Sequence, residues 1–197
     1  DLQVNLRLHP DLYYASNSEQ KRRLPGIVAP FTDEAKQLRG LHRTYLDPRQ
    51  PKKEAVREAK KALRRLDKTL NGGIVLCGPV PMSAHVQVCE GIETGLSVGM
   101  ATARPVVACT TAQLLDNWVP FQGTRFVTVW ADTGKAGQTH ARNLKARLEE
   151  TGISCRLIFP WEETEGQERD WNDILVSEGE DAIRAAYAGD CSRCTYE

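Results

Sequence analysis

The feature that most constrains the fold is an alternation of two kinds of segment from residue 86 onward. Short runs rich in β-branched residues alternate with stretches of helical pattern. Strands that alternate with helices indicate βαβ units, in which parallel strands form one sheet and helices cover both of its faces. We therefore predict an α/β domain over residues 81–190. Its strands are expected at 86–89, 105–109, 125–130 and 155–160, and its helices at 92–102, 111–118, 138–151 and 179–188.

The first 80 residues differ from this pattern and predict a smaller α+β segment. Two strands, 26–31 and 37–47, are expected to form an antiparallel pair, because the polar stretch between them is typical of a turn. A strongly basic stretch at 52–68 predicts a helix, and 72–79 predicts another strand. Two prolines and several small residues place a domain boundary near residue 80.

The formal net charge of zero hides a division along the chain. Residues 1–70 carry 16 Lys and Arg against 9 Asp and Glu, whereas residues 71–197 carry 10 against 17. Such a division suits a protein that holds polyanions with one part and cations with the other. Solvated helix faces with a chance excess of one sign would give the same counts, so charge alone leaves both interpretations open.

The six cysteines are scattered, and four of them end apolar runs, where a thiol behaves as a small hydrophobic group. This favours a reducing, cytoplasmic compartment. No apolar run approaches the roughly 20 residues that a membrane span needs, so no membrane partner is expected. Cys191 and Cys194 form one Cys-x-x-Cys pair, which is half of a structural zinc site. Residues 191–197 are therefore expected to be a polar tail.

The stretch VWADTGKAGQ, residues 129–138, admits three interpretations. A Walker phosphate loop would require glycine where Val129 stands and Ser or Thr where Ala136 stands. A dinucleotide-binding turn would require Gly-x-Gly-x-x-Gly directly after the strand, but the strand ends in Asp132 and the glycines are spaced Gly-x-x-Gly. The third interpretation, in which Asp132 is part of a metal site, fits the residues best.

Further acids follow the neighbouring strands. Glu90 ends the strand at 86–89, and Asp170 and Asp173 follow the strand at 155–160. Because parallel strands end at one edge of a sheet, these carboxylates are expected to meet there, and a hard cation such as Mg²⁺ would relieve their repulsion. Taken singly, Glu90 and Asp170 could instead cap the helices that follow them.

The motifs CEGIETGLSV, VWADTGKAG and DWNDIL, in this order and spacing, resemble the Toprim domain of DNA primases, topoisomerases and related nucleases. The similarity is strongest to primase-like proteins of phages, plasmids and other mobile elements, and LRGLHRTYLD…GGIVLCGP resembles the region that precedes Toprim there. The resemblance implies a Rossmann-like parallel sheet, a catalytic role for Glu90 and Asp132, and metal binding by Glu90, Asp132, Asp170 and Asp173. The place of the second aspartate of the Asp-x-Asp motif is taken by Gly134, or that aspartate has been lost in a short deletion.

This resemblance implies Mg²⁺-dependent nucleotidyl transfer, with Mn²⁺ as an alternative ion. The expected ligands are single-stranded DNA and nucleoside triphosphates, the product is an RNA primer, and a helicase in the same or another chain is an expected partner. The change at Gly134 leaves two alternatives: a degenerate Toprim module that binds nucleic acid or a protein without catalysis, and a Toprim nuclease.

Basic residues of the first segment, together with one from the second motif, are expected to hold phosphates, and Tyr45 could stack on a base. A solvated helix stabilised by its own Glu–Lys and Glu–Arg pairs remains the alternative for the basic stretch. The predicted nucleic-acid-binding residues are Arg39, His42, Arg43, Lys60, Arg64 and Lys135.

Overall fold

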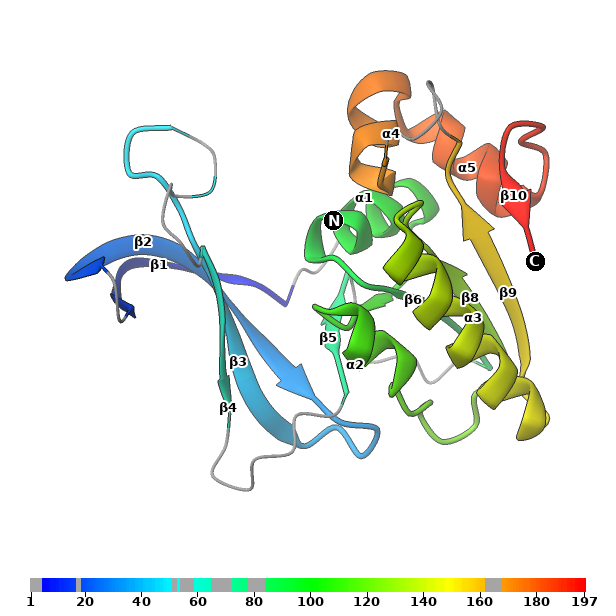
Figure 1. Cartoon of the computed structure of the whole chain (residues 1–197), viewed down its shortest axis with the longest axis horizontal. Coiled ribbons are helices and arrows are strands. Elements are labelled where there is room, and N and C mark those ends of the chain that lie inside the picture. Colours follow the sequence, from blue (N-terminus) through cyan, green and yellow to red (C-terminus); the bar gives the residue numbers. More distant parts are fainter. Residues whose placement is uncertain are drawn as a thin grey trace.

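The protein is described by a computed structural model in which two β-sheets lie side by side (Figure 1). A strongly curved antiparallel sheet holds the first part of the chain, and a second sheet flanked by helices holds the rest. The structure describes residues 5–16, 19–50, 53, 59–64, 72–77, 84–161 and 168–197.

The second sheet has six strands in the order β10-β9-β8-β6-β7-β5. The four inner strands run parallel to one another, and the two edge strands run antiparallel to the inner strands beside them. The predicted parallel sheet is therefore confirmed. Its strands are β5 (Ile74–Leu76), β6 (His85–Cys89), β7 (Val106–Ala108), β8 (Phe126–Trp130), β9 (Ser154–Phe159) and β10 (Thr195–Tyr196).

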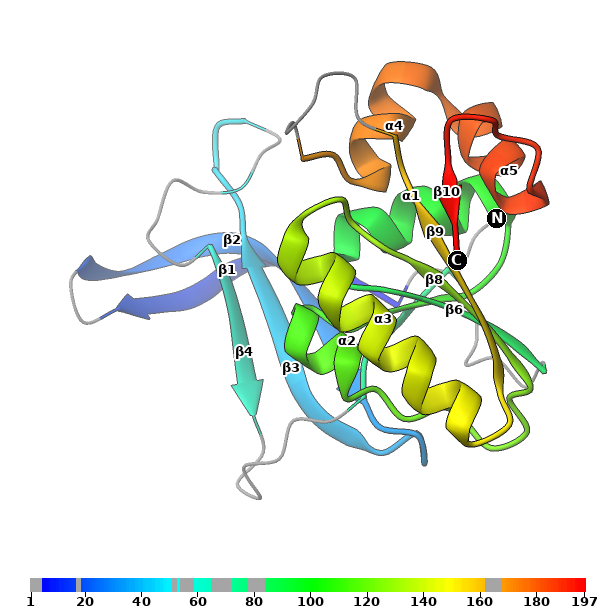
Figure 2. The same cartoon turned by 45° about the vertical axis from the view of Figure 1, so that its right-hand side comes forward.

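Helices cover both faces of this sheet because successive strand residues point to opposite sides. Val127 and Val129 of β8 pack in the core under α2 and α3, whereas Trp130 packs in the core under α1, α4 and α5. Figure 2 shows α2 and α3 on one face and α1 on the other. The helices are α1 (Ile92–Thr102), α2 (Ala112–Asp116), α3 (Lys135–Glu150), α4 (Trp171–Glu178) and α5 (Glu180–Ala188).

The first sheet is antiparallel, in the order β1-β2-β3-β4. A small core of Tyr14, Leu24 and Tyr45 stabilises it, and the two tyrosine rings meet edge to face with centroids 5.0 Å apart. The predicted strand 26–31 is confirmed as part of a longer strand, and the predicted strand 37–47 is confirmed over the shorter range 38–45. The four strands are β1 (Arg7–Ser16), β2 (Glu19–Thr32), β3 (Leu38–Tyr45) and β4 (Lys60–Arg64).

The prediction of a basic helix at 52–68 is wrong for the part of it that forms β4. Lys60 to Arg64 pair antiparallel with β3, from Thr44 to Gly40. The free edge of β3 supplies hydrogen-bond partners, and such tertiary pairing overrides helix propensity. Residues 52, 54–58 and 65–68 lie outside the described residues. Among the described residues before β5, the regular elements are strands, and the α+β character expected for this segment stays a prediction.

The strand predicted at 72–79 belongs to the second sheet, where β5 pairs with β7. The two sheets are joined just before it, because Thr32 and Gly73 exchange backbone hydrogen bonds of 3.0 and 2.9 Å. Gly72 adopts a φ of +115°, and a Cβ there would lie 1.9 Å from the Thr32 carbonyl oxygen, so only glycine fits. The boundary expected near residue 80 falls within 78–83, outside the described residues.

The polar tail expected at 191–197 is instead part of the domain. β10 pairs with β9, and Arg142 of α3 donates two hydrogen bonds of 2.8 and 2.7 Å to the Glu197 carboxylate. Cys191 and Cys194 are half-buried and free. Among the helices in the described ranges, none combines the length and the apolar character that crossing a membrane requires.

Candidate metal and phosphate site

The four acids predicted to form a metal site line one pocket at the carboxyl edge of the second sheet. The pocket has a volume of about 410 Å³, and its walls come from the loops after β6 and β8, the start of α3 and the segment that leads into α4. The site lies where ligands bind in open α/β sheets. Its lining residues are Glu90, Asp132, Gly134, Lys135, Ala136, Gly137, Glu168, Arg169, Asp170 and Asp173.

Glu90 follows β6 directly and is half-buried. Its carbonyl oxygen accepts a hydrogen bond of 2.7 Å from the Thr110 N–H. Burial raises the pKa of the Glu90 carboxyl group, and a hydrogen bond from the Ala112 backbone N–H opposes that shift. The cap residue of α1 is Gly91 and not Glu90, so helix capping does not explain Glu90.

Asp132 has the most strongly raised pKa of the acids that line this pocket. Its Oδ1 atom is buried and has no hydrogen-bond partner among the described residues. Burial raises the pKa of Asp132 to about 7, and the nearby carboxylates of Glu90, Asp170, Asp173 and Glu168 push it in the same direction. A buried oxygen without a partner, surrounded by other carboxylates, is what a bound cation would satisfy.

Asp170 is both a helix cap and a wall of the pocket. Its Oδ1 accepts hydrogen bonds of 2.9 Å from the Asn172 and Asp173 N–H groups, and the Asp173 carboxylate accepts one of 3.1 Å from the Asp170 N–H. This capping box begins α4 at Trp171. The capping interpretation is therefore right for Asp170, and capping leaves the Asp170 and Asp173 carboxylates at the pocket.

The loop that carries Asp132 is fastened to the segment that carries Asp170. The Thr133 hydroxyl accepts a hydrogen bond of 2.7 Å from the Arg169 N–H and donates one of 3.2 Å to the Arg169 carbonyl oxygen. The Trp171 indole N–H donates to the Ala131 carbonyl oxygen at 3.2 Å. These contacts fix the separation of two acid-bearing segments that are far apart in the sequence, and pattern analysis did not find them.

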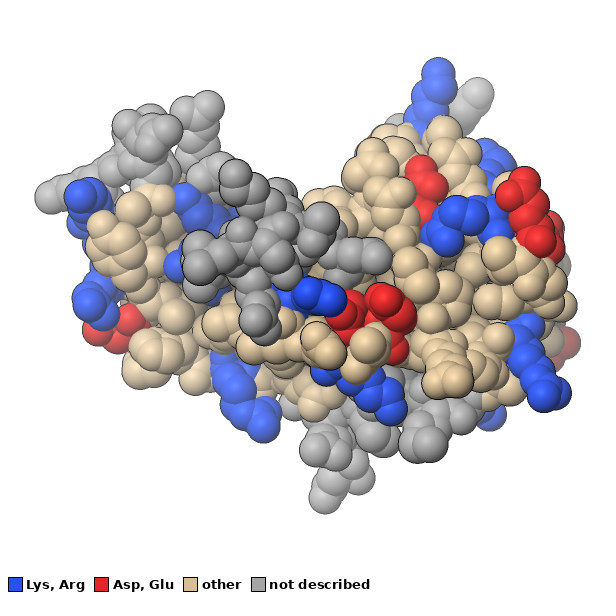
Figure 3. Space-filling view, turned by 90° about the horizontal axis from the view of Figure 1, so that it is seen from below, with Lys and Arg blue, Asp and Glu red and all other residues tan. Residues whose placement is uncertain are grey.

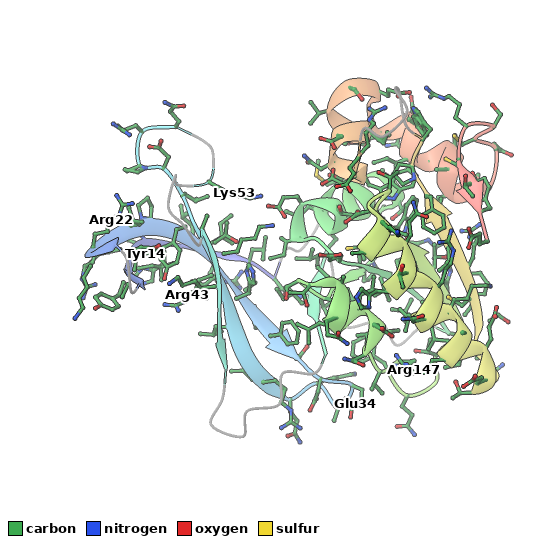
Figure 4. The ribbon with its side chains drawn as sticks, viewed as in Figure 1. Tyr14, Arg22, Glu34, Arg43, Lys53 and Arg147 are labelled. Carbon is green, nitrogen blue, oxygen red and sulfur yellow. The ribbon has the colours of Figure 1, made fainter. Side chains whose placement is uncertain are left out.

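A second pocket, of about 240 Å³, shares Glu90, Asp132 and Asp170 with the first and extends to the first sheet. There Glu93, one residue into α1, forms ion pairs of 2.7 Å with Lys53 and 2.9 Å with Lys60. Figure 4 shows Lys53 between the two parts of the molecule.

The ionisation of Glu93 is set by these two lysines. Burial alone would raise its pKa, but the hydrogen bonds from Lys53 and Lys60 outweigh that effect and lower the pKa to about 2. Two cations are therefore held beside the acidic pocket by a carboxylate that stays ionised at neutral pH.

The other predicted phosphate-binding residues lie in differing surroundings. Arg39 is paired with Asp33 at 2.6 Å, and Arg43 donates a 3.4 Å hydrogen bond to the Tyr13 carbonyl oxygen. His42 is buried, and burial together with Lys60 lowers its pKa to about 4, so it is neutral at pH 7. Lys135 lines the acidic pocket, while the Arg64 side chain lies outside the described residues.

Tyr45, expected as a surface on which a base could stack, is fully buried. Its ring packs on Tyr14, and its hydroxyl donates a 2.8 Å hydrogen bond to the Tyr13 carbonyl oxygen. Figure 4 shows Tyr14 on the outer part of the first sheet together with Arg22 and Arg43. Figure 3 shows Lys and Arg side chains around that end of the molecule and a group of acidic side chains near its middle.

The donor set of the pocket fits a divalent cation with hard-ligand preference, because it consists of carboxylates and one of them has an unpartnered buried oxygen. Among the residues that the structure describes, no three acidic, His or Cys side chains already converge at metal-binding distance. The protein therefore contains a Rossmann-like α/β domain with an acidic site at the carboxyl ends of its parallel strands.

Two family models match parts of this chain. Residues 85–181 match the family model of the Toprim domain. Residues 1–73 match that of a domain of unknown function, DUF7146. Residues 85–181 are therefore similar to the Toprim domain, and the fold expected from the motifs of this chain is confirmed. A search of curated proteins finds no match.

Solved structures of primase cores share the fold. The DnaG catalytic core has a TM-score of 0.58 at 17% identity, covering 93% of this chain and 66% of its own. The DnaG primase catalytic domain bound to ssDNA has a TM-score of 0.56 at 17% identity, and the match covers 89% of this chain and 55% of that structure. The primase fragment of the bacteriophage T7 primase-helicase protein has a TM-score of 0.57 at 13% identity, and the match covers 89% of this chain and 65% of that structure. The chain thus spans between about half and two thirds of these structures, and the likeness supports a primase-like fold.

Proposed function

We propose that this chain is the catalytic part of a primase-like nucleotidyltransferase that joins ribonucleotides into an RNA primer on single-stranded DNA. The observation that carries the proposal is the meeting of Glu90, Asp132, Asp170 and Asp173 at one pocket of a Toprim sheet. The primase structures with the same fold, one of them bound to ssDNA, support this choice over other Toprim activities.

The acids of the pocket have distinct proposed roles. Glu90, Asp132, Asp170 and Asp173 would hold Mg²⁺, with Mn²⁺ as an alternative. When bound, such an ion stabilises negative charge on the phosphoryl oxygens during transfer. The raised pKa of Glu90 also makes it a stronger base than an exposed glutamate, and we propose that it accepts a proton from the attacking hydroxyl group.

Basic residues around the acids would hold the anionic substrates. Lys135 opens α3 beside the pocket, and Lys53 and Lys60 lie at its other side. We propose residues 81–190 as the catalytic unit, assisted by β5, and the sheet β1–β4 as the part that holds template or nucleotide phosphates through Arg39, Arg43 and Arg64. His42, which is buried and neutral, would support that sheet instead of contacting phosphate.

The wider setting of this activity is also a proposal. A helicase in the same or another chain is the proposed partner, and one of the similar structures is a fragment of a primase-helicase protein. Replication of a mobile element is the proposed process. All six cysteines are free, which supports a reducing, cytoplasmic compartment.

The test is primer synthesis by the full chain from labelled ribonucleotides on single-stranded DNA, with Mg²⁺ and with Mn²⁺. We expect short RNA products that disappear in Glu90→Gln and in Asp132→Asn. Glu149→Gln is a matched control, because Glu149 pairs with Lys145 within α3 and is not among the residues lining the acidic pocket. No product with either ion, or product unchanged in both pocket variants, would refute the proposal.

A second candidate function follows from one observation, the glycine at 134. Fewer carboxylates weaken metal binding, so the domain could bind nucleic acid or a partner without catalysis. Salt-sensitive binding to single-stranded DNA, with neither synthesis nor cleavage, would favour this candidate. Shortening of the labelled DNA in the same reactions would instead identify a Toprim nuclease.

A further inference from the structure

Gly134 stands where the resembled motif has its second aspartate, and the space beside it is filled by another residue. A Cβ atom on Gly134 would lie 3.1 Å from Oε1, 3.3 Å from Cδ and 3.4 Å from Oε2 of Glu168. All three contacts are to the carboxylate group. Glu168 therefore places its charge at the point from which a side chain at position 134 would begin.

We propose that Glu168 is a further metal-binding residue, and that its carboxylate replaces the one that Gly134 lacks. The proposal rests on the metal site of the proposed function. It assigns the replacement to a segment 34 positions further along the chain, which leads into α4.

The backbone does not require glycine at position 134. Its φ of −58° and ψ of 137° are open to any residue, so conformational freedom does not explain the choice. A Cβ atom at position 134 would make a tight contact with the end of the Glu168 side chain, which would have to move by a few tenths of an ångström. Glycine at 134 thus leaves room for the Glu168 carboxylate in its observed position.

The Glu168 side chain is exposed, and the backbone next to it is anchored. The next residue, Arg169, is buried and exchanges hydrogen bonds with Thr133, which fixes the backbone beside the Asp132 loop. Within the described ranges, no ion pair or hydrogen bond engages the Glu168 carboxylate. Its charge contributes to the raised pKa of Asp132, so the two carboxylates are close enough to interact.

Direct titration with Mn²⁺ provides the test, because electron paramagnetic resonance reports free Mn²⁺ and needs no catalysis. The full chain is compared with Glu168→Gln, and Glu150→Gln, at the exposed far end of α3, is the matched control. Loss of a residue that orients a metal ligand costs about tenfold to a hundredfold in affinity, so loss of a ligand should cost at least about tenfold. We expect that loss in Glu168→Gln and none in Glu150→Gln.

A relocation of the carboxylate makes the test specific. The double variant Gly134→Asp with Glu168→Gln returns an acid to the motif position, and we expect it to regain most of the lost affinity. Melting of each variant without metal checks that it is folded. Unchanged affinity in a folded Glu168→Gln variant overturns the inference, as does a double variant that binds no better than Glu168→Gln.

The same titration separates this inference from the proposed function. If the unaltered chain binds no Mn²⁺, the metal site itself is refuted, and the role of Glu168 is refuted with it. If Asp132→Asn abolishes binding while Glu168→Gln leaves it unchanged, the metal site stands and only the role of Glu168 is refuted.

Discussion

The ion pairs of Glu93 with Lys53 and Lys60 allow a quantitative prediction for Glu93→Gln. The amide keeps the size of the side chain but removes its charge. A pKa of about 2, against an ordinary value of 4.5, corresponds to about 3 kcal/mol of stabilisation. The Glu93 side chain is 33% exposed, and solvent screens its ion pairs, so we expect a loss of about 1–2 kcal/mol in the free energy of unfolding at pH 7.

The pH dependence of this loss has a defined sign. The pKa of Glu93 is lower in the folded state, so its stabilising contribution is fully present above the unfolded value of 4.5 and is lost as pH falls through about 2. Urea unfolding of both proteins between pH 7 and pH 3 measures this. We expect the difference between them to be largest at neutral pH and to shrink below pH 4.5.

Glu34→Gln is the control for this experiment, because Glu34 is exposed in the turn between β2 and β3 (Figure 4). An exposed substitution of this kind should change the free energy of unfolding by less than about 0.5 kcal/mol. The reasoning is refuted if Glu93→Gln behaves like this control at pH 7, or if its deficit is the same at pH 3 as at pH 7.

Two further predictions concern the loop after β8. Thr133→Val leaves the buried Arg169 N–H without its acceptor, which should lower the free energy of unfolding in urea by about 1–3 kcal/mol. Thr133→Ser keeps the hydroxyl group and should have nearly the stability of the unaltered protein. Equal stability of the two variants would contradict a stabilising role for this hydrogen bond. Protons should compete with metal at Asp132, whose pKa is about 7, so Mn²⁺ titration should show weaker apparent affinity at pH 6 than at pH 8. An affinity that does not vary over this range would count against Asp132 as a ligand.

The second sheet could be predicted from sequence because the pattern of apolar residues that indicates each strand or helix is local and recurs along the chain. Each buried strand is a short β-branched run, and the intervening helices have apolar positions such as Leu144 and Leu148, which pack on the sheet. Once the strands are parallel, their carboxyl ends must share an edge. The placement of Glu90 and Asp132 at one pocket follows from that topology without knowledge of side-chain contacts.

Glu168 could not be found in this way, because its relation to Gly134 depends on how two loops approach each other. The sequence shows a missing aspartate at 134, but nothing local links that position to residue 168. The link comes from the hydrogen bonds between Thr133 and Arg169, which are tertiary contacts. A search for any acid near the third motif, rather than only those within DWNDIL, would have been the available signal.

The strand β4 explains both the failed helix prediction and part of the charge division along the chain. A basic helix would have spread its lysines around a solvated cylinder, whereas pairing with β3 points alternate residues to opposite faces of the sheet. Lys60 thereby reaches Glu93, while Lys61 lies over the Tyr14 ring and donates to the Ala15 carbonyl oxygen. The excess of positive charge in the first segment is therefore not one undivided phosphate-binding surface, because part of it is paired with Glu93 of α1 beside the acidic pocket.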